Sequence, residues 1–165
     1  MQEGSKLERP LGVYGLGGWL IVVQIGLWGS VLSGLVLLFV NIIPSYSPDV
    51  WNTLTMPGSD MYHQLWKPLI VFETIFCIAS LAFIAVLLVC FYRRKAVTPR
   101  LFIILYAVNL VVTIIDTALV VTIQNAIGLV SQGNLYADVI RNALTCAIWI
   151  PYFLKSERVA NTFVR

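Results

Sequence analysis

Three charged side chains inside long apolar runs are the residues of this chain with the greatest potential for chemistry. Asp116 lies within an almost uninterrupted apolar run at residues 101–123, Glu73 lies in the run before it, and Arg141 lies early in the run after it. If these runs cross a bilayer, the three charges are costly to bury, and such charges usually pair with one another or mark a ligand path. They are therefore the first candidates for a functional site.

Polar residues accompany each of these charges at intervals of three or four, which places them on one helical face. The members are Glu73, Cys77 and Ser80 in one run, Asn109, Thr113 and Asp116 in the next, and Arg141, Thr145 and Trp149 in the last, with Asn142 and Cys146 beside them. Three helices that each carry one polar stripe on an apolar surface are expected to turn those stripes towards one another.

The depth of the polar residues predicts two layers. At 1.5 Å per residue from the outer ends of the runs, Glu73 and Arg141 lie about 8 Å deep and Asp116 about 11 Å deep. Gln24 in the first run and Asn109 both fall about 10 to 12 Å from the inner ends, as a second, uncharged layer. Little that is polar lies between Asn109 and the inner surface, so we expect a polar pocket that opens outward.

The composition places the whole chain in a membrane. Of its 165 residues 59% are hydrophobic and 12% charged, and the mean hydropathy is +0.85, whereas soluble domains carry about 25% charged residues. Four runs reach the roughly 17 to 25 residues that a crossing needs. They cover residues 16–43, 68–91, 101–123 and 136–154.

These runs predict a single domain over residues 1–165, an all-α integral membrane protein built as a four-transmembrane-helix bundle. An outer segment at residues 44–67 contains helix-start signals, because Ser47 precedes Pro48 and Ser59 precedes Asp60. Residues 155–165 form a short amphipathic tail on the cytoplasmic face.

The basic residues predict the orientation. Nine of the eleven precede the first run, separate the second from the third, or follow the last: Lys6, Arg9, Arg93, Arg94, Lys95, Arg100, Lys155, Arg158 and Arg165. By the positive-inside rule both termini are cytoplasmic. The same distribution accounts for the net charge of +3 as attraction to the lipid bilayer, so nucleic acid is not an expected partner.

Small residues on the first run predict a packing face. Gly26, Ser30 and Gly34 recur every four residues, and such a face lets another helix approach closely in a membrane. The partner helix belongs either to the same bundle, to a second copy in a homodimer, or to another membrane protein.

Metal, cofactor and enzymatic chemistry have little support. Cys77, Cys90 and Cys146 lie inside the apolar runs without CxxC spacing, and His63 is the sole histidine, so we expect free thiols, a surface histidine and no metal or cofactor. Two carboxyl groups can act as acid and base, but no nucleophile motif or metal set accompanies them. We therefore do not expect an enzyme.

Two stretches at opposite ends of the chain resemble a known family. Gly17-Gly18-Trp19-Leu20 opens the first run, and residues 149–163 read WIPYFLKSERVANTF. With an acid in the third run and an arginine opening the fourth, they resemble the YdgK-like family of small bacterial inner-membrane proteins, domain of unknown function 2569. The resemblance covers nearly the whole chain except residues 44–66. It implies a four-span protein of the bacterial inner membrane and supplies no activity.

Two interpretations of the charged layer remain. In one, Arg141 neutralises Asp116 and hydrogen-bonds Glu73, and the charges only fix helix packing in a structural or accessory subunit. In the other, the layer is an outward-facing pocket for a cation, a proton or a lipid headgroup in a non-enzymatic binding or transport-related protein. Two acids and one arginine leave a formal charge of −1, so we expect a proton on one carboxyl or a cation beside it.

Overall fold

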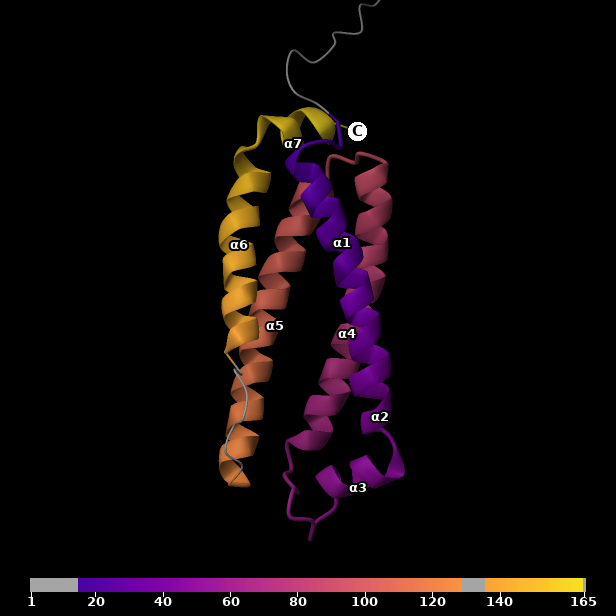
Figure 1. Ribbon diagram of the computed structural model, residues 1–165, viewed down its shortest axis with the longest axis vertical. Coiled ribbons are helices and arrows are strands. Elements are labelled where there is room, and N and C mark those ends of the chain that lie inside the picture. Colours follow the sequence, from indigo (N-terminus) through magenta and orange to yellow (C-terminus); the bar gives the residue numbers. More distant parts are fainter. Residues whose placement is uncertain (1–14, 129–135, 165) are drawn as a thin grey trace, which may run out of the picture.

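A computed structural model describes residues 15–128 and 136–164, and every regular element in these two ranges is a helix (Figure 1). Three continuous helices are long and apolar enough to cross a membrane: Trp19–Ser45, Trp66–Tyr92 and Thr98–Ala126, with mean hydropathies of 2.1, 2.8 and 2.2. At 1.5 Å per residue each is about 40 Å long, which exceeds the roughly 30 Å of a hydrocarbon core. The chain is therefore a membrane protein.

The elements follow one another in the order of the predicted runs. The first long helix consists of α1 (Trp19–Val36), a π-helical stretch η1 (Leu37–Ile42) and α2 (Ile43–Ser45). After it come α3 (Pro48–Thr55), α4 (Trp66–Tyr92), α5 (Thr98–Ala126), α6 (Ala137–Lys155) and α7 (Glu157–Thr162). The predicted run at 136–154 thus corresponds to α6, a helix of 19 residues.

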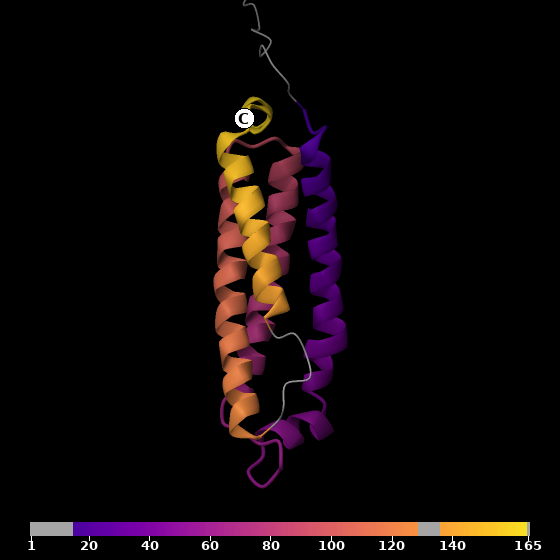
Figure 2. The same ribbon diagram turned by 60° about the vertical axis from the view of Figure 1, so that its left-hand side comes forward.

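Helices α5 and α6 pack side by side and antiparallel (Figures 1 and 2). Asn142 Nδ2 donates to Thr113 Oγ1 at 2.9 Å, and the Cys146 thiol donates to the Tyr106 carbonyl at 3.3 Å. In this register the first residue of α6 lies level with residue 117 of α5. About nine residues of α5, roughly 13 Å, therefore extend past the start of α6.

The hydrophobic core fills only one part of the bundle. It is formed by Leu20, Val23 and Leu27 of α1, Ile84, Leu87 and Phe91 of α4, Phe102 and Leu105 of α5, Phe153 of α6, and Val159 and Phe163 at α7. The Phe102 and Phe153 rings stack with centroids 4.6 Å apart. Because these side chains come from the α7 end of each helix, that end of the bundle is closely packed.

Helix α7 lies across the end of the bundle and contributes to this core (Figure 1). Ser156 forms its N-cap, since its hydroxyl accepts from the Val159 amide at 3.4 Å. Val159 and Phe163 are buried, and the Phe163 ring lies 5.7 Å from that of Phe91. The amphipathic pattern predicted for the tail thus has its apolar face on the bundle.

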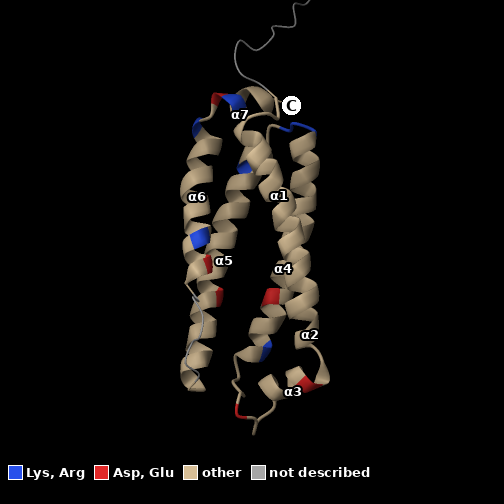
Figure 3. Cartoon of the chain, in the orientation of Figure 1, with Lys and Arg blue, Asp and Glu red and all other residues tan. Residues whose placement is uncertain are grey.

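Most of the described basic residues gather at the same end (Figure 3); the exceptions are Lys67, at the start of α4, and Arg141, near the start of α6. We call this the basic end; it contains the α4–α5 connection and α7, with Arg93, Arg94, Lys95, Arg100, Lys155 and Arg158. Lys6, Arg9 and Arg165 lie outside the described residues. The opposite end contains α3, which is held by Tyr46: its ring stacks on Trp51 at 5.4 Å and its hydroxyl lies 2.9 Å from Thr74 Oγ1.

Candidate functional site

A cavity of about 610 Å³ lies among α1, η1, α4, α5 and α6, adjoining the hydrophobic core on the side away from the basic end. Ile84 and Leu105 belong both to that core and to the cavity wall. The polar side chains that line the cavity are Ser30, Ser33, Ser80, Asn109, Thr113, Asp116, Asp138, Arg141, Asn142 and Thr145. The predicted polar stripes of α4, α5 and α6 therefore contribute to one site.

Most of the predicted site residues meet at this cavity. Asp116, Arg141, Asn142 and Asn109 line it directly. Glu73 is half-buried on α4 and lies near Asp116 of α5. Two of the three charged residues predicted to share one layer, Glu73 and Asp116, thus lie near each other; whether that layer faces outward stays a prediction.

The partner of Arg141 differs from the predicted one. Its guanidinium Nη1 lies 3.1 Å from Asp138 Oδ1, three residues earlier on the same helix, and the two side chains are 75% and 66% exposed. Asp138 competes successfully because it stands in the first turn of α6, where an acid is favoured, and at the i,i+3 spacing that brings side chains together. Arg141 therefore does not pin α6 to Asp116 in the way that the packing interpretation requires.

Asp138 is the site residue that the sequence reasoning missed. The spacing Asp138-x-x-Arg141 at the start of a helix is the signal that indicates it. Asp138 and Asp116 line the same cavity, from α6 and α5. Three acids and one arginine now give the group a formal charge of −2, instead of the −1 expected from Glu73, Asp116 and Arg141 alone.

Asp116 lies at the centre of this group of acids. Its Oδ1 atom is buried, and no hydrogen-bond donor among the described residues reaches it. A buried carboxylate oxygen without a donor is unfavourable, because the group has lost water without replacing it. A proton shared with Glu73 or a cation in the cavity would supply the missing partner.

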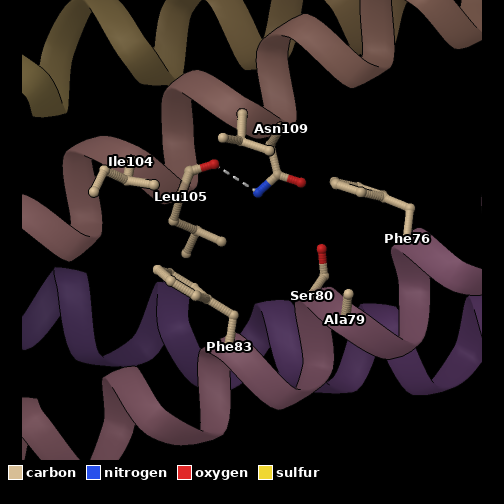
Figure 4. Close-up of a pocket in the computed structure, with 8 residues that line it drawn as sticks. Phe76, Ala79, Ser80, Phe83, Ile104, Leu105 and Asn109 are labelled. Atoms are coloured by element: carbon tan, nitrogen blue, oxygen red, sulfur yellow. Dashed lines mark hydrogen bonds between the residues drawn. The ribbon is translucent and has the colours of Figure 1, made fainter.

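Two asparagines complete the wall. The bond from Asn142 to Thr113 joins α6 to α5 beside the acids. Asn109 donates to the carbonyl of Leu105 in its own helix at 3.0 Å, and its side chain points towards Ser80 of α4 (Figure 4). Asn109 therefore faces the space between α4 and α5 with its amide group.

Gln24 lies outside the cavity. Its Nε2 donates to the hydroxyl of Tyr92 at 2.7 Å, and Trp28 Nε1 donates to the same hydroxyl at 3.2 Å. Tyr92 ends α4 next to the start of α5, whereas Asn109 lies about eleven residues, roughly 16 Å, further along α5. The predicted second layer of Gln24 and Asn109 is therefore not formed, since the two residues lie at different depths.

The predicted packing face on α1 is divided. A Cβ atom at Gly34 would lie 2.8 Å from Leu81 Cδ2, and the Gly34 carbonyl accepts from the Cys77 thiol at 3.5 Å, so α1 and α4 meet closely there. A Cβ at Gly26 would meet nothing within 4 Å, and the exposed Ser30 donates to the Gly26 carbonyl. Only the Gly34 end of this face packs within the bundle.

The two stretches that carry the family resemblance meet at the basic end. The Arg158 guanidinium packs on the backbone of Gly17 and Gly18, and a Cβ atom at Gly18 would lie only 2.5 Å from its Nη1. The Trp19 and Trp149 rings pack edge to face with centroids 6.4 Å apart. The first helix and the end of the chain thereby close the core together.

These observations define a helical membrane protein with a polar cavity beside its hydrophobic core. The family model described as "Protein of unknown function (DUF2569)" matches residues 13–164, and the chain belongs to that family. The match includes both of the stretches that meet at the basic end, so the resemblance to domain of unknown function 2569 is confirmed. Comparisons with curated proteins and with solved structures give no match.

Proposed function

We propose that this chain is a non-enzymatic binding or transport-related protein of the bacterial inner membrane, with an outward-facing site for a cationic group. In this proposal α6 is a fourth crossing and both termini are cytoplasmic. The observation that carries the proposal is the excess of acids at the cavity: Asp116, Asp138 and, beside them, Glu73 outnumber the single guanidinium of Arg141.

The length and surroundings of α6 support a fourth crossing. Its 19 residues extend about 28 Å, close to the thickness of a hydrocarbon core. Its polar residues Asn142 and Thr145 line the cavity, and its two exposed charges, Asp138 and Arg141, line the mouth of the same cavity and pair with each other. With four crossings, the basic end falls on the cytoplasmic side and the cavity opens on the other.

The closed core favours binding over a continuous pore. Ile84 and Leu105 end the cavity, and the aromatic cluster of Phe91, Phe102 and Phe153 lies between it and the basic end. A ligand that enters from outside therefore reaches a closed floor. Transport would require α1, α4, α5 and α6 to separate at the basic end in a second conformation.

Binding of a cationic group follows from the electrostatics of the site. A formal charge of −2 in a partly desolvated cavity attracts a cation, an ammonium group or protons strongly, because Coulomb energies rise as the effective dielectric falls. The Asp116 oxygen that lacks a donor gives the ligand a place to hydrogen-bond. Asn142 and Thr113 hold the neighbouring wall in place.

A binding assay tests this proposal. Tetramethylammonium is titrated into the purified protein in a maltoside detergent, and the melting temperature is followed. We expect it to stabilise the unmodified protein and to lose its effect with Asp116→Asn, while Gln24→Leu, which changes a polar residue outside the cavity, behaves like the unmodified protein. Absence of any effect of tetramethylammonium or Na⁺ on the unmodified protein would refute cation binding.

Labelling with a membrane-impermeant thiol reagent tests the orientation. Arg141→Cys and Met56→Cys should be labelled in intact cells, and Lys95→Cys only after the membrane is broken. The unmodified protein gives the background from the three native thiols, all of which lie inside helices. Labelling of Lys95→Cys in intact cells, with protection of Met56→Cys, would reverse the proposed topology.

The alternative function is an accessory subunit, and one surface favours it. The face of α1 around Gly26 has open space, and Ile25, Trp28 and Leu32 beside it are exposed. Such a face can receive a helix of another membrane protein or of a second copy. Oxidative cross-linking of Gly26→Cys identifies a homodimer, and a stoichiometric partner lost with Gly26→Leu identifies a hetero-complex. A monodisperse monomer in native lipid would exclude both.

A further inference from the structure

A second, smaller cavity lies between α4 and α5 (Figure 4). It measures about 170 Å³, and its lining residues are Phe76, Ala79, Ser80 and Phe83 of α4 with Ile104, Leu105, Val108 and Asn109 of α5. Ser80 and Asn109 are the polar members of this set. The small side chains of Ala79 and Ser80 leave the space open between the two phenylalanine rings.

The smaller cavity reaches the membrane-facing surface of the bundle. Ile104 and Val108 on its α5 wall are 50% and 45% exposed. Both stand in the first half of α5, which is long and apolar enough to cross a membrane. The surroundings of such a surface in a bilayer are hydrocarbon chains.

The two cavities share part of their walls. Phe76, Ser80, Leu105 and Asn109 line both the small apolar cavity and the large polar one. The polar boundary between them is formed by Ser80 and Asn109, whose side chains approach each other from α4 and α5 (Figure 4). The α4–α5 gap is thus a window between the hydrocarbon and the acidic cavity.

We propose that the two cavities together bind one amphiphile, with an ammonium head in the large cavity and a hydrocarbon chain in the α4–α5 window. This inference rests on the proposed function and names its ligand class. The acids at Asp116 and Asp138 determine the sign of the head group, and the apolar lining determines the nature of the chain. Asn109 precedes Asp116 by seven positions on α5, which is about 10 Å along the helix. The ligand must therefore extend about 10 Å from the window to the acids.

Two sources can supply this chemistry. One is an amine-bearing phospholipid such as phosphatidylethanolamine, whose phosphate has a partner in the exposed guanidinium of Arg141. The other is a free single-chain ammonium amphiphile that partitions into the membrane. An anionic lipid without an amine lacks the group that the acids require.

The experiment compares a head-only probe with a head-and-chain probe. Affinities for tetramethylammonium and dodecyltrimethylammonium are measured by melting-temperature titration in maltoside detergent. Ala79→Phe fills the window, because Ala79 lines the small cavity and not the large one. Ile78→Phe is the matched control. Ile78 is next to Ala79 in the sequence, its side chain is 55% exposed, and it lines neither cavity.

Ala79→Phe should weaken dodecyltrimethylammonium binding about tenfold or more, because added volume in an occupied site is poorly accommodated. It should leave tetramethylammonium binding within about twofold, and Ile78→Phe should change neither affinity. Val108→Phe narrows the window from the α5 side. If Ala79→Phe and Val108→Phe change the two affinities in the same way, the effect does not come from a folding defect in one variant. Each variant's melting temperature without ligand confirms folding.

The outcomes separate this inference from the proposed function. If both probes bind with unchanged affinity to Ala79→Phe and Val108→Phe, the window is not part of the site, while cation binding at Asp116 stands. If neither probe binds the unmodified protein, the proposed function fails as well.

Native mass spectrometry from mixed phosphatidylethanolamine and phosphatidylglycerol nanodiscs identifies the source. Retention of phosphatidylethanolamine that is lost with Ala79→Phe indicates a membrane aminolipid. Binding of dodecyltrimethylammonium without lipid retention indicates a free amphiphile. Preferential retention of phosphatidylglycerol would overturn the inference, because it would require a cationic site.

Discussion

Gly18 is the residue at which a single added methyl group should be most informative. It precedes α1 with φ 61° and ψ −136°, a backbone conformation that side chains other than glycine rarely adopt. A Cβ atom there would also lie 2.5 Å from Arg158 Nη1 and 3.1 Å from its Cζ. Gly18→Ala therefore introduces backbone strain and displaces a guanidinium at the same time.

The backbone term is the larger of the two. Holding alanine in this region costs about 2 kcal/mol, whereas the guanidinium lies at the end of a flexible side chain and can move aside. For a chain of this length, about 2 kcal/mol lowers the melting temperature by roughly 4 to 8 °C. Gly17→Ala is the matched control, because its Cβ would lie 3.3 Å from the same nitrogen without a positive φ.

Thermal unfolding in detergent measures the effect, and a double-mutant cycle identifies its cause. We expect Gly18→Ala to cost nearly as much in an Arg158→Ala background as alone, and Gly17→Ala to cost less than about 1 kcal/mol. If Gly18→Ala became harmless once Arg158 was removed, contact with the guanidinium would be the cause. Equal stability losses for Gly17→Ala and Gly18→Ala would also refute the argument that backbone strain at Gly18 is the cause.

Two further predictions concern the polar cavity. Arg141→Ala should lower the free energy of unfolding by only about 0.2 to 1 kcal/mol in chemical denaturation, because its pair with Asp138 is exposed; a loss of 3 kcal/mol or more would indicate a buried bridge to Asp116. Asn142→Leu should cost about 0.6 to 1.7 kcal/mol through loss of its bond to Thr113. Thr113→Val, which also removes the bond from its hydroxyl to the Asn109 carbonyl, should then cost less in the Asn142→Leu background than alone, and additive losses would mean that the bond between Asn142 and Thr113 is not formed.

The sequence was sufficient to predict the long helices and several of the residues around the cavity. Apolar runs of more than 17 residues leave helix as the only structure that satisfies the backbone in lipid, and the three-to-four spacing of Asn109, Thr113 and Asp116 determines the face that they share. The tail pattern of Val159 and Phe163 likewise identified a helix with one apolar side. These patterns depend only on the spacing of residues within one helix, so the tertiary structure does not change them.

The partners of the polar residues depended on details that apolar runs do not contain. Arg141 had a nearby and a distant acid, and the choice depended on α6 beginning at Ala137, which makes Asp138 a first-turn residue. Gln24 and Asn109 were assigned to one depth because depth was counted from the starts of the apolar runs. The helices begin at Trp19 and Thr98, so Gln24 lies five residues from its helix start and Asn109 eleven. The window at Ala79 has no sequence signature, since a small apolar residue in a helix equally indicates close packing.

The π-helical stretch η1 has a consequence for how this family can vary in length. Within Leu37–Ile42 the chain bonds one residue further back than in an α-helix, as in the Ile43 amide that donates to the Leu38 carbonyl. The π-helical stretch contains one residue more than an α-helix of the same length. The residues that follow it are therefore rotated about the helix axis by about 100°. That turn directs Tyr46 towards Thr74 on α4.

A deletion of one residue within 37–42 would thus leave a regular α-helix of adequate length, but would rotate Tyr46 and the α3 segment away from α4. The residue count of the first helix, and not only its side chains, determines where the far loop docks.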